Sequence, residues 1–226
     1  MSISTSGVSL KWGPTPVSLS KVIEIKDFPD LGSAPESIET TTLSDKSQTY
    51  IPGILSQGAM EFTANYMKAD YSAVSEDTDT DLYYALEFGE NGSEGIFMWR
   101  GRHFVWVSAA GVNSPVEMKI SVVPSTAPSL AVDIESVTLA GLTEGEESEE
   151  LVISYTDTPG GPVILAYKWQ ISDAEDGEFS DIAGAISATY MPISSDVGKF
   201  IRCQVTATGF ASGTVASNAQ EVQESL

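Results

Sequence analysis

The sequence predicts a mainly β fold. Stretches in which apolar and polar residues alternate recur along the chain, as in Met60-Glu61-Phe62-Thr63-Ala64 and in 116–122, and such alternation is typical of half-buried strands. Turn-forming residues separate these stretches, with 19 glycines and 11 prolines among 226 residues. Hydrophobic residues make up 42% of the chain and charged residues 19%, which provides for a buried core and argues against a disordered tail.

A segment rich in proline and small polar residues, Pro124–Ser129, follows the last alternating stretch of the N-terminal half. We predict two domains, residues 1–123 and 131–226, joined by a linker at 124–130. Charge is divided unevenly: residues 1–123 carry 8 basic and 16 acidic residues, a net charge of −8, and residues 124–226 carry 3 and 16, a net charge of −13.

The first domain is predicted to consist of strands and one short helix. The helix fits 68–76, where alanines and Val74 mix with Tyr71. Residues 1–20 are polar and rich in Gly, Pro and Ser, so an N-terminal arm that orders only against a neighbour is expected there. The strands are expected near 22–25, 38–42, 61–66, 82–88, 95–100, 103–107 and 116–122.

The segment 38–66 is the most informative part of the chain. Ile38 and the threonines at 40–42 favour a strand, and 60–66 alternates as a second one. The connection Leu43–Gln57 is long, and it carries apolar side chains that a monomer gains nothing by exposing. A turn at Pro52-Gly53 would present them together. We therefore predict a contact loop, with candidate residues Leu43, Asp45, Tyr50, Ile51, Pro52, Gly53, Ile54 and Leu55.

The concentrated positive charge of the first domain lies in Trp99–Trp106, where Arg100, Arg102 and His103 form a candidate basic site. Alternation places both arginines on the side of the strand opposite Trp99. Two interpretations remain open: a solvated face, or a site that pairs with acidic residues of a neighbouring subunit, for which the planar guanidinium is well suited.

The second domain reads as seven or so short strands, with Trp169 in the middle of one of them. Ile201, Cys203 and Val205 share one face of a later strand, so Cys203 is predicted to be a small core residue. Since it is the single cysteine, no intrachain disulfide is possible, which suits a reducing cytoplasm.

No catalytic site, cofactor site or metal site is predicted. The single histidine, His103, lies among aromatic residues and has no nucleophile nearby in the sequence. Asp77-Thr78-Asp79-Thr80-Asp81 resembles the start of an EF-hand loop, but Leu82 stands where Gly is required and Phe88 where Glu is required. A polar turn after the helix is the simpler interpretation.

The net charge of −21 excludes a protein that grips nucleic-acid phosphates, and it disfavours an anionic membrane surface. An acidic surface is nevertheless suited to a passage to which DNA must not adhere; solubility alone is the simpler explanation. The N-terminal twenty residues contain no continuous apolar stretch, so a secretory signal is not expected, and no segment is long and apolar enough for a membrane-spanning helix.

Two segments of the chain resemble known families. Ile38 with Thr40–Thr42, Leu43-Ser44-Asp45, Tyr50-Ile51-Pro52-Gly53 and a strand ending in Tyr66 are similar to the tail tube (major tail) proteins of long-tailed bacteriophages. Residues 135–218, with Tyr167-Lys168-Trp169-Gln170, Ile182–Tyr190 and Asp196-Val197-Gly198-Lys199-Phe200, resemble bacterial and phage immunoglobulin-like domains. Cys203 departs from that pattern, because it follows Phe200 by three residues rather than two.

The resemblances imply a structural virion protein. The first domain would be a β-sandwich or barrel that forms hexameric rings, and the contact loop would stack these rings into a tube. The genome would pass through the lumen without specific binding, and other tail proteins (tape measure, tail terminator, distal tail) would be partners. The immunoglobulin-like domain would decorate the exterior and hold weakly to cell-surface glycans. Assembly would take place in the host cytoplasm, and the mature location would be the phage tail.

The alternative is a bacterial surface or secreted binding protein built on immunoglobulin-like modules, for which an export signal would be expected. An enzyme with an accessory β-domain is a third possibility, but the sequence offers no pair of nucleophile and base to support it.

Overall fold

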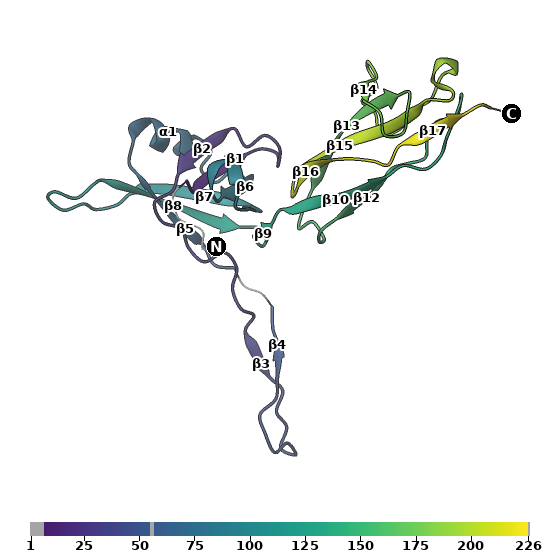
Figure 1. Ribbon diagram of the computed structural model, residues 1–226. Coiled ribbons are helices and arrows are strands. Elements are labelled where there is room, and N and C mark those ends of the chain that lie inside the picture. The colour runs from purple at the N-terminus through teal and green to yellow at the C-terminus, as the bar shows by residue number, and fades with distance from the viewer. Residues whose placement is uncertain (1–6, 55–56, 226) are drawn as a thin grey trace. The chain divides into compact units, whose positions relative to one another are not determined.

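The computed structural model describes residues 7–54 and 57–225, and the chain forms two compact units, Met1–Leu130 and Ala131–Leu226 (Figure 1). Strands predominate in both units, which confirms the mainly β prediction. Each unit has its own cluster of buried hydrophobic residues.

Unit 1 is built on one antiparallel sheet with strand order β2-β1-β6-β7-β8-β5. β9 also pairs with β7, on the N-terminal half of that long strand. One α-helix, α1 (Lys68–Glu76), occupies the predicted range, and a 3-10 turn, η1, covers Glu90–Gly92. The strands are β1 (Ser9–Gly13), β2 (Lys21–Glu24), β5 (Met60–Asn65), β6 (Leu82–Glu87), β7 (Ile96–Val107), β8 (Glu117–Pro124) and β9 (Ser129–Leu130).

The two edges of this sheet meet at one point. Beyond the end of β2, the backbone amides of Lys26 and Asp27 donate to the carbonyl of Thr63 in β5, at 2.8 and 3.3 Å. The amide of Thr63 donates in return to the carbonyl of Asp27 at 2.9 Å. The sheet therefore curls round its own core and closes through a single bridge.

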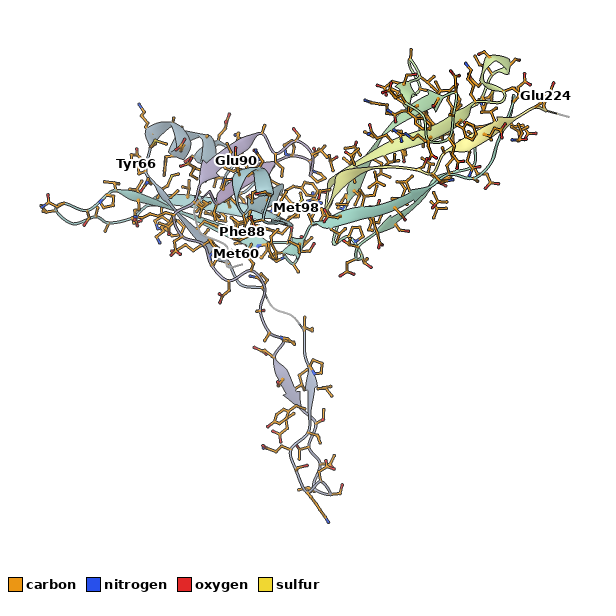
Figure 2. The ribbon with its side chains drawn as sticks, in the orientation of Figure 1. Met60, Tyr66, Phe88, Glu90, Met98 and Glu224 are labelled. Carbon is orange, nitrogen blue, oxygen red and sulfur yellow. The ribbon has the colours of Figure 1, made fainter. Side chains whose placement is uncertain are left out.

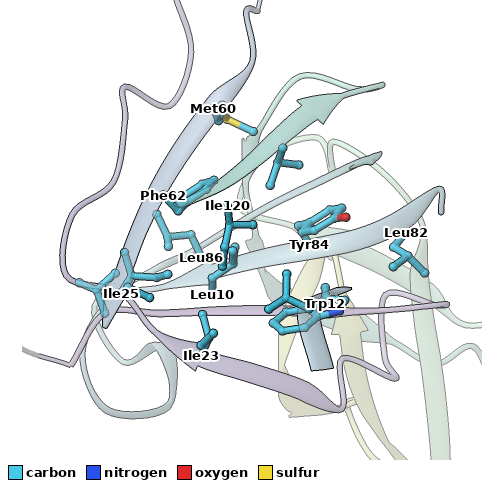
Figure 3. Packing of buried hydrophobic residues seen from close by; sticks show 14 of the residues in the cluster. Leu10, Trp12, Ile23, Ile25, Met60, Phe62, Leu82, Tyr84, Leu86 and Ile120 are labelled. Carbon is cyan, nitrogen blue, oxygen red and sulfur yellow. The ribbon is translucent and has the colours of Figure 1, made fainter. Parts of the chain in front are cut away.

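The core of unit 1 is apolar and rich in aromatic residues (Figure 3). The alternation in Met60-Glu61-Phe62-Thr63-Ala64 places Met60, Phe62 and Ala64 inside, as expected for a half-buried strand. Trp99 lies between two other rings: its centroid is 6.0 Å from that of Phe62 and 5.8 Å from that of Tyr84, and both pairs are close to parallel.

The predicted N-terminal arm at 1–20 is wrong for the part of it that the structure describes. β1 pairs with both β2 and β6, and its side chains Leu10 and Trp12 are buried. Burial of a large apolar side chain contributes roughly 1.5–3 kcal/mol, so this strand belongs to the core. The alternation of Val8, Leu10 and Trp12 with Ser9 and Lys11 is the signal for this strand, and the surrounding Gly, Pro and Ser residues make it easy to miss because it is short.

The predicted linker at 124–130 is also wrong, since this segment belongs to unit 1. The amides of Ser125 and Thr126 donate to the carbonyl of Arg100 at 2.7 and 3.2 Å. β9 then pairs with β7, placing Ser129 opposite Met98 and Leu130 opposite Phe97. The two prolines therefore bracket a turn between β8 and β9.

Unit 2 is all β, with strand order β11-β17-β15-β16-β10-β12, and β13 pairs with β15 and with the short β14. β16 meets β10, and β17 meets β11, in short parallel pairs. A 3-10 turn, η2, covers Ser194–Asp196. The strands are β10 (Val132–Thr138), β11 (Leu142–Thr143), β12 (Val152–Tyr155), β13 (Val163–Ser172), β14 (Ser180–Asp181), β15 (Phe200–Gly209), β16 (Ala211–Ala216) and β17 (Gln220–Gln223).

Trp169 is the centre of the core of unit 2. It lies opposite Cys203 on the neighbouring strand, and neither side chain is exposed. The indole N–H of Trp169 donates to the carbonyl of Ser187 at 2.9 Å, and its ring stacks on Tyr190 at 5.5 Å between centroids. The hydroxyl of Tyr190 donates to Asp196 at 2.8 Å. Cys203 is thus a core residue, and burial raises the pKa of its thiol to about 11.

A truncation series tests where unit 1 ends. A chain that ends at Leu130 should unfold at a higher temperature than one that ends at Val123, because the shorter chain loses β9 and the two hydrogen bonds to Arg100. A difference of about 5 °C is expected if these contacts contribute roughly 1 kcal/mol. Circular dichroism melts of both chains measure it, and equal midpoints would contradict the assignment of 124–130 to unit 1.

Candidate functional site: an exposed arm and the outer face of β7

The predicted contact loop forms a two-stranded arm. β3 (Ser37–Glu39) pairs with β4 (Tyr50–Pro52), with Ile38 opposite Ile51 and Glu39 opposite Tyr50. Figure 1 shows the pair apart from the sheet, and within the described residues neither strand pairs with any other. The chain re-enters the sheet at Met60, which is labelled in Figure 2 and is buried.

Every residue of β3 and β4 is exposed. Ile38, Tyr50 and Ile51 each keep about half of their surface open, at 50%, 53% and 50%. Leu43 and Ile54 are more exposed still, and Leu55 lies outside the described residues. The arm thus presents large apolar side chains that no described part of the chain covers.

The described part of the connection 43–57 is more regular than the sequence indicates. The expected strand 38–42 is shorter, and Pro52, expected in a turn with Gly53, lies in β4 opposite Ser37. The amide of Gly53 donates to the carbonyl of Glu36 at 2.6 Å and so extends the ladder. Proline is tolerated here because β4 is an edge strand.

Hydrogen bonds within the arm order its end. The carboxylate of Asp45 accepts from the amide of Thr42 at 2.7 Å and from its hydroxyl at 2.9 Å. Both bonds lower the pKa of Asp45, and the bond from the backbone amide has the larger effect. The amide of Thr40 donates to the carbonyl of Thr49 at 2.8 Å. Asp45 therefore orders the turn at the end of the arm, and it remains exposed there.

The two arginines of the candidate basic site lie on the outer face of β7, as the alternation predicts, but each is paired within its own chain. Arg100 contacts Asp81 at 3.0 Å and lies 5.3 Å from the ring centre of Tyr83. Arg102 contacts the side chain of Asp79 at 3.3 Å. About half of each arginine side chain remains exposed, at 45% and 53%.

His103 does not belong to this site. It points to the other face of β7, is 1% exposed, and bridges two elements of unit 1. Its Nε2 lies 2.7 Å from the carbonyl of Val74 in α1, and its Nδ1 lies 2.7 Å from the hydroxyl of Tyr84. A carbonyl can only accept, so Nε2 carries the proton and Tyr84 donates to Nδ1.

Burial lowers the pKa of His103 and outweighs the Val74 hydrogen bond and the charge of Asp77, both of which raise it. Burial likewise raises the pKa of Tyr84. His103 is therefore a neutral structural group that ties the end of α1 to β6 and β7.

The three aspartates that resemble an EF-hand serve as anchors of the turn after α1. Asp77 accepts from the indole of Trp12 at 3.0 Å and contacts Lys21 at 2.6 Å. Burial would raise the pKa of Asp77, but the hydrogen bonds from Lys21 and Trp12 outweigh it and the pKa is lowered. Asp79 and Asp81 hold the two arginines of β7. Within 7–54 and 57–225, no three His, Cys, Asp or Glu side chains are placed to hold a metal.

The outer face of β7 carries a feature that the sequence patterns alone did not single out. Phe104 and Trp106 follow Arg102 at two-residue steps and remain 43% and 41% exposed. Val123 of β8 lies opposite Arg102, and Lys119 lies opposite Trp106. The signal is present in the alternation that places the arginines outside, because the same period continues to Phe104 and Trp106.

No family model matches the chain, and no curated protein matches it. Among solved structures, a chain from the "Structure of the phage p2 baseplate in its activated conformation with Sr" is similar over 93% of this chain and 86% of that chain, with 13% identity and a TM-score of 0.37. At this score the correspondence in chain path is loose, and it carries no functional conclusion. No helix in the described parts of the chain is long and apolar enough to cross a membrane.

The environment of His103 gives a testable pH dependence. In the unfolded chain a histidine takes up a proton near pH 6.5, whereas the buried His103 does so only at lower pH. The stability linked to His103 is therefore fully present above pH 6.5 and is lost as the pH falls through the folded pKa.

Proton NMR follows this titration directly, because the chain holds one histidine. The folded pKa should lie below 6.5, and His103→Gln should flatten the loss of stability between pH 6.5 and the onset of carboxylate titration. A folded pKa at or above 6.5 would contradict the neutral, desolvated assignment.

Proposed function

We propose that this chain is a subunit of a phage tail tube, in which rings of identical copies stack and the arm makes the contact between rings. The observation that carries the proposal is the arm itself: a two-stranded ribbon with exposed Ile38, Tyr50 and Ile51 and no partner among the described residues. The resemblance of 38–66 to tail tube proteins supports the same role.

An arm without a partner is unfavourable for two physical reasons. A two-stranded hairpin is at best marginally stable in water, because it has no face to bury. Its outer edges also present unpaired backbone groups, which monomeric proteins usually protect. Both deficits are removed when the arm lies against a second copy, so association stabilises the arm.

The remaining parts of the proposal rest on charge and on resemblance. A net charge of −21 is compatible with a tube whose lumen repels DNA and leaves it mobile. Unit 2, with its resemblance to immunoglobulin-like domains, would decorate the exterior and contact cell-surface glycans weakly. Six copies per ring, and other tail proteins at the ends of the tube, follow from the resemblance alone. In this role the protein performs no catalysis and holds no cofactor.

Replacement of Tyr50 and Ile51 by Ser tests the arm. Both side chains are exposed and make no contribution to the core, so the melting temperature should change little while assembly is suppressed. The matched control replaces Val152 and Ile186 of unit 2, which are 65% and 72% exposed, and should assemble like the original chain.

Negative-stain microscopy and sedimentation at rising protein concentration give the readout for this pair of variants. If the Tyr50/Ile51 variant still formed tubes, the arm would not be the contact between rings. If the original chain itself remained monomeric at every salt concentration, the tail tube proposal would fail and a surface-binding role would be favoured.

Hydrogen exchange gives a second test that needs no substitution. Amides of β3 and β4 should exchange quickly in the monomer, because a ribbon without tertiary contacts opens at little cost in free energy. The same amides should be protected in tubes. Equal protection in both states would contradict the assignment of the arm as the contact between rings.

A further inference from the structure

We infer that Arg202 of unit 2 is the centre of a site that binds an isolated oxyanion, a carboxylate or a phosphate, on an otherwise neutral glycan. The inference rests on the proposed function and deepens one part of it, the contact of unit 2 with cell-surface glycans, because it names the binding group and the class of glycan. All of the residues concerned belong to unit 2.

Arg202 differs from the other two arginines of the chain. Arg100 and Arg102 each form an ion pair with an aspartate of their own chain. Within residues 7–54 and 57–225, no carboxylate lies at ion-pair distance from Arg202. Residues 124–226 carry 16 acidic and 3 basic residues, so carboxylates are abundant there. The fold of unit 2 therefore leaves the charge of this guanidinium uncompensated where a counter-ion would be easy to supply.

Neutral groups hold the guanidinium of Arg202 in place. Its Nε donates to Oε1 of Gln170 at 2.9 Å, and its Cζ lies 4.1 Å from the ring centre of Phe179. Gln170 is 9% exposed and lies opposite Arg202 in the paired strands β13 and β15 (Figure 1). Because one edge and one face of the guanidinium are fixed before any ligand arrives, binding costs less conformational entropy.

The carboxylate of Asp181, which is next in this chain of contacts, is satisfied by other groups. Its Oδ1 accepts from Nε2 of Gln170 at 2.8 Å, and its Oδ2 lies 3.3 Å from Nζ of Lys168. Asp181 therefore orients Gln170 and does not neutralise Arg202. The connected set carries two positive charges, on Lys168 and Arg202, and one negative charge.

The terminal nitrogens of Arg202 are free to bind a ligand. A guanidinium has five N–H donors, and Gln170 takes the one on Nε. None of the four on the two Nη atoms has an acceptor among the residues that the structure describes. These donors form a planar fork that matches two oxygens of a carboxylate or of a phosphate. A fixed fork without a counter-ion is the chemistry of an anion-binding site.

The surroundings of the fork favour a single anion among neutral sugars. Gln204 and Thr206 follow Arg202 at two-residue steps on the same side of β15, and their amide and hydroxyl groups suit sugar hydroxyls. Carboxylates border this face at Asp181 of β14 and Glu221 of β17. A densely charged polymer would be repelled by them, whereas a glycan with one isolated oxyanion would not.

Binding of three related monosaccharides to the full-length chain tests the site. Galacturonate carries a carboxylate, galactose 6-phosphate carries a phosphate, and galactose carries neither. Ligand-observed saturation-transfer NMR measures each Kd whether the chain is monomeric or assembled. At least one acidic sugar should bind with a Kd of about 1 mM, and galactose at least about tenfold more weakly. The comparison of the two acidic sugars identifies which oxyanion the fork takes.

Two substitutions of Arg202 separate the fork from its charge. Arg202→Gln should weaken binding of the acidic sugar about tenfold, and Arg202→Lys, which keeps the charge but not the fork, at least about threefold. The matched control is Arg102→Gln, which removes the same charge from unit 1 and should leave the Kd within about twofold of the original. Circular dichroism checks that each variant is folded.

Several results would overturn the inference. They are equal Kd values for galactose and both acidic sugars, unweakened binding by folded Arg202→Gln, and equal weakening by Arg102→Gln. If binding weakens as the protein concentration rises, a carboxylate of another copy occupies the fork, and the glycan assignment fails. If tubes form and neither acidic sugar is preferred, the inference fails while the tail tube proposal stands. If an acidic sugar binds and the chain stays monomeric, the tail tube proposal fails while the site stands.

Discussion

The closure of the first sheet through Thr63 is the constraint on which unit 1 depends. Backbone hydrogen bonds join Thr63 to Lys26 and Asp27, and they turn an open sheet into a curled one that encloses its own core. They also fix the base of the arm, because the chain leaves the sheet after Asp27 and returns at β5. The arm is thus a long insertion whose two ends are held together, and its exposed strands are free to form contacts without any cost to the core.

A second set of interactions fixes the helix on this framework. His103 contacts Val74 of α1 on one side and Tyr84 on the other, while Asp77 joins the end of α1 to Trp12 and Lys21. These groups are far apart in the sequence. The hydrogen bonds of His103 are buried, whereas Asp77 and Lys21 are partly exposed. The loss of a partner of His103 would leave a buried polar group unpaired, which costs about 1–3 kcal/mol.

Charged groups are paired differently in the body of unit 1 and in the arm. The aspartates after α1 neutralise arginines of β7 and a lysine of β2, so the described acidic groups near this turn are used within the chain. The acidic arm differs, because Lys46 is the one basic residue in its own sequence between 36 and 53. The arm therefore keeps an excess of negative charge within its own sequence, with three carboxylates and one lysine between residues 36 and 53.

The sequence by itself determined the mainly β class, the position of α1 and the apolar character of the arm, because these depend on local alternation and composition. It also placed Arg100 and Arg102 on one side of β7, and Cys203 on a core face. It did not determine that β1 lies inside the sheet, that β9 belongs to unit 1, or that Asp45 caps a turn. Proximity along the chain groups His103 with the arginines, although the pleat places it on the opposite face. Only the tertiary structure decided these points, since pairing between distant strands, and the partners that make burial of a polar group favourable, leave no periodic signal in the sequence.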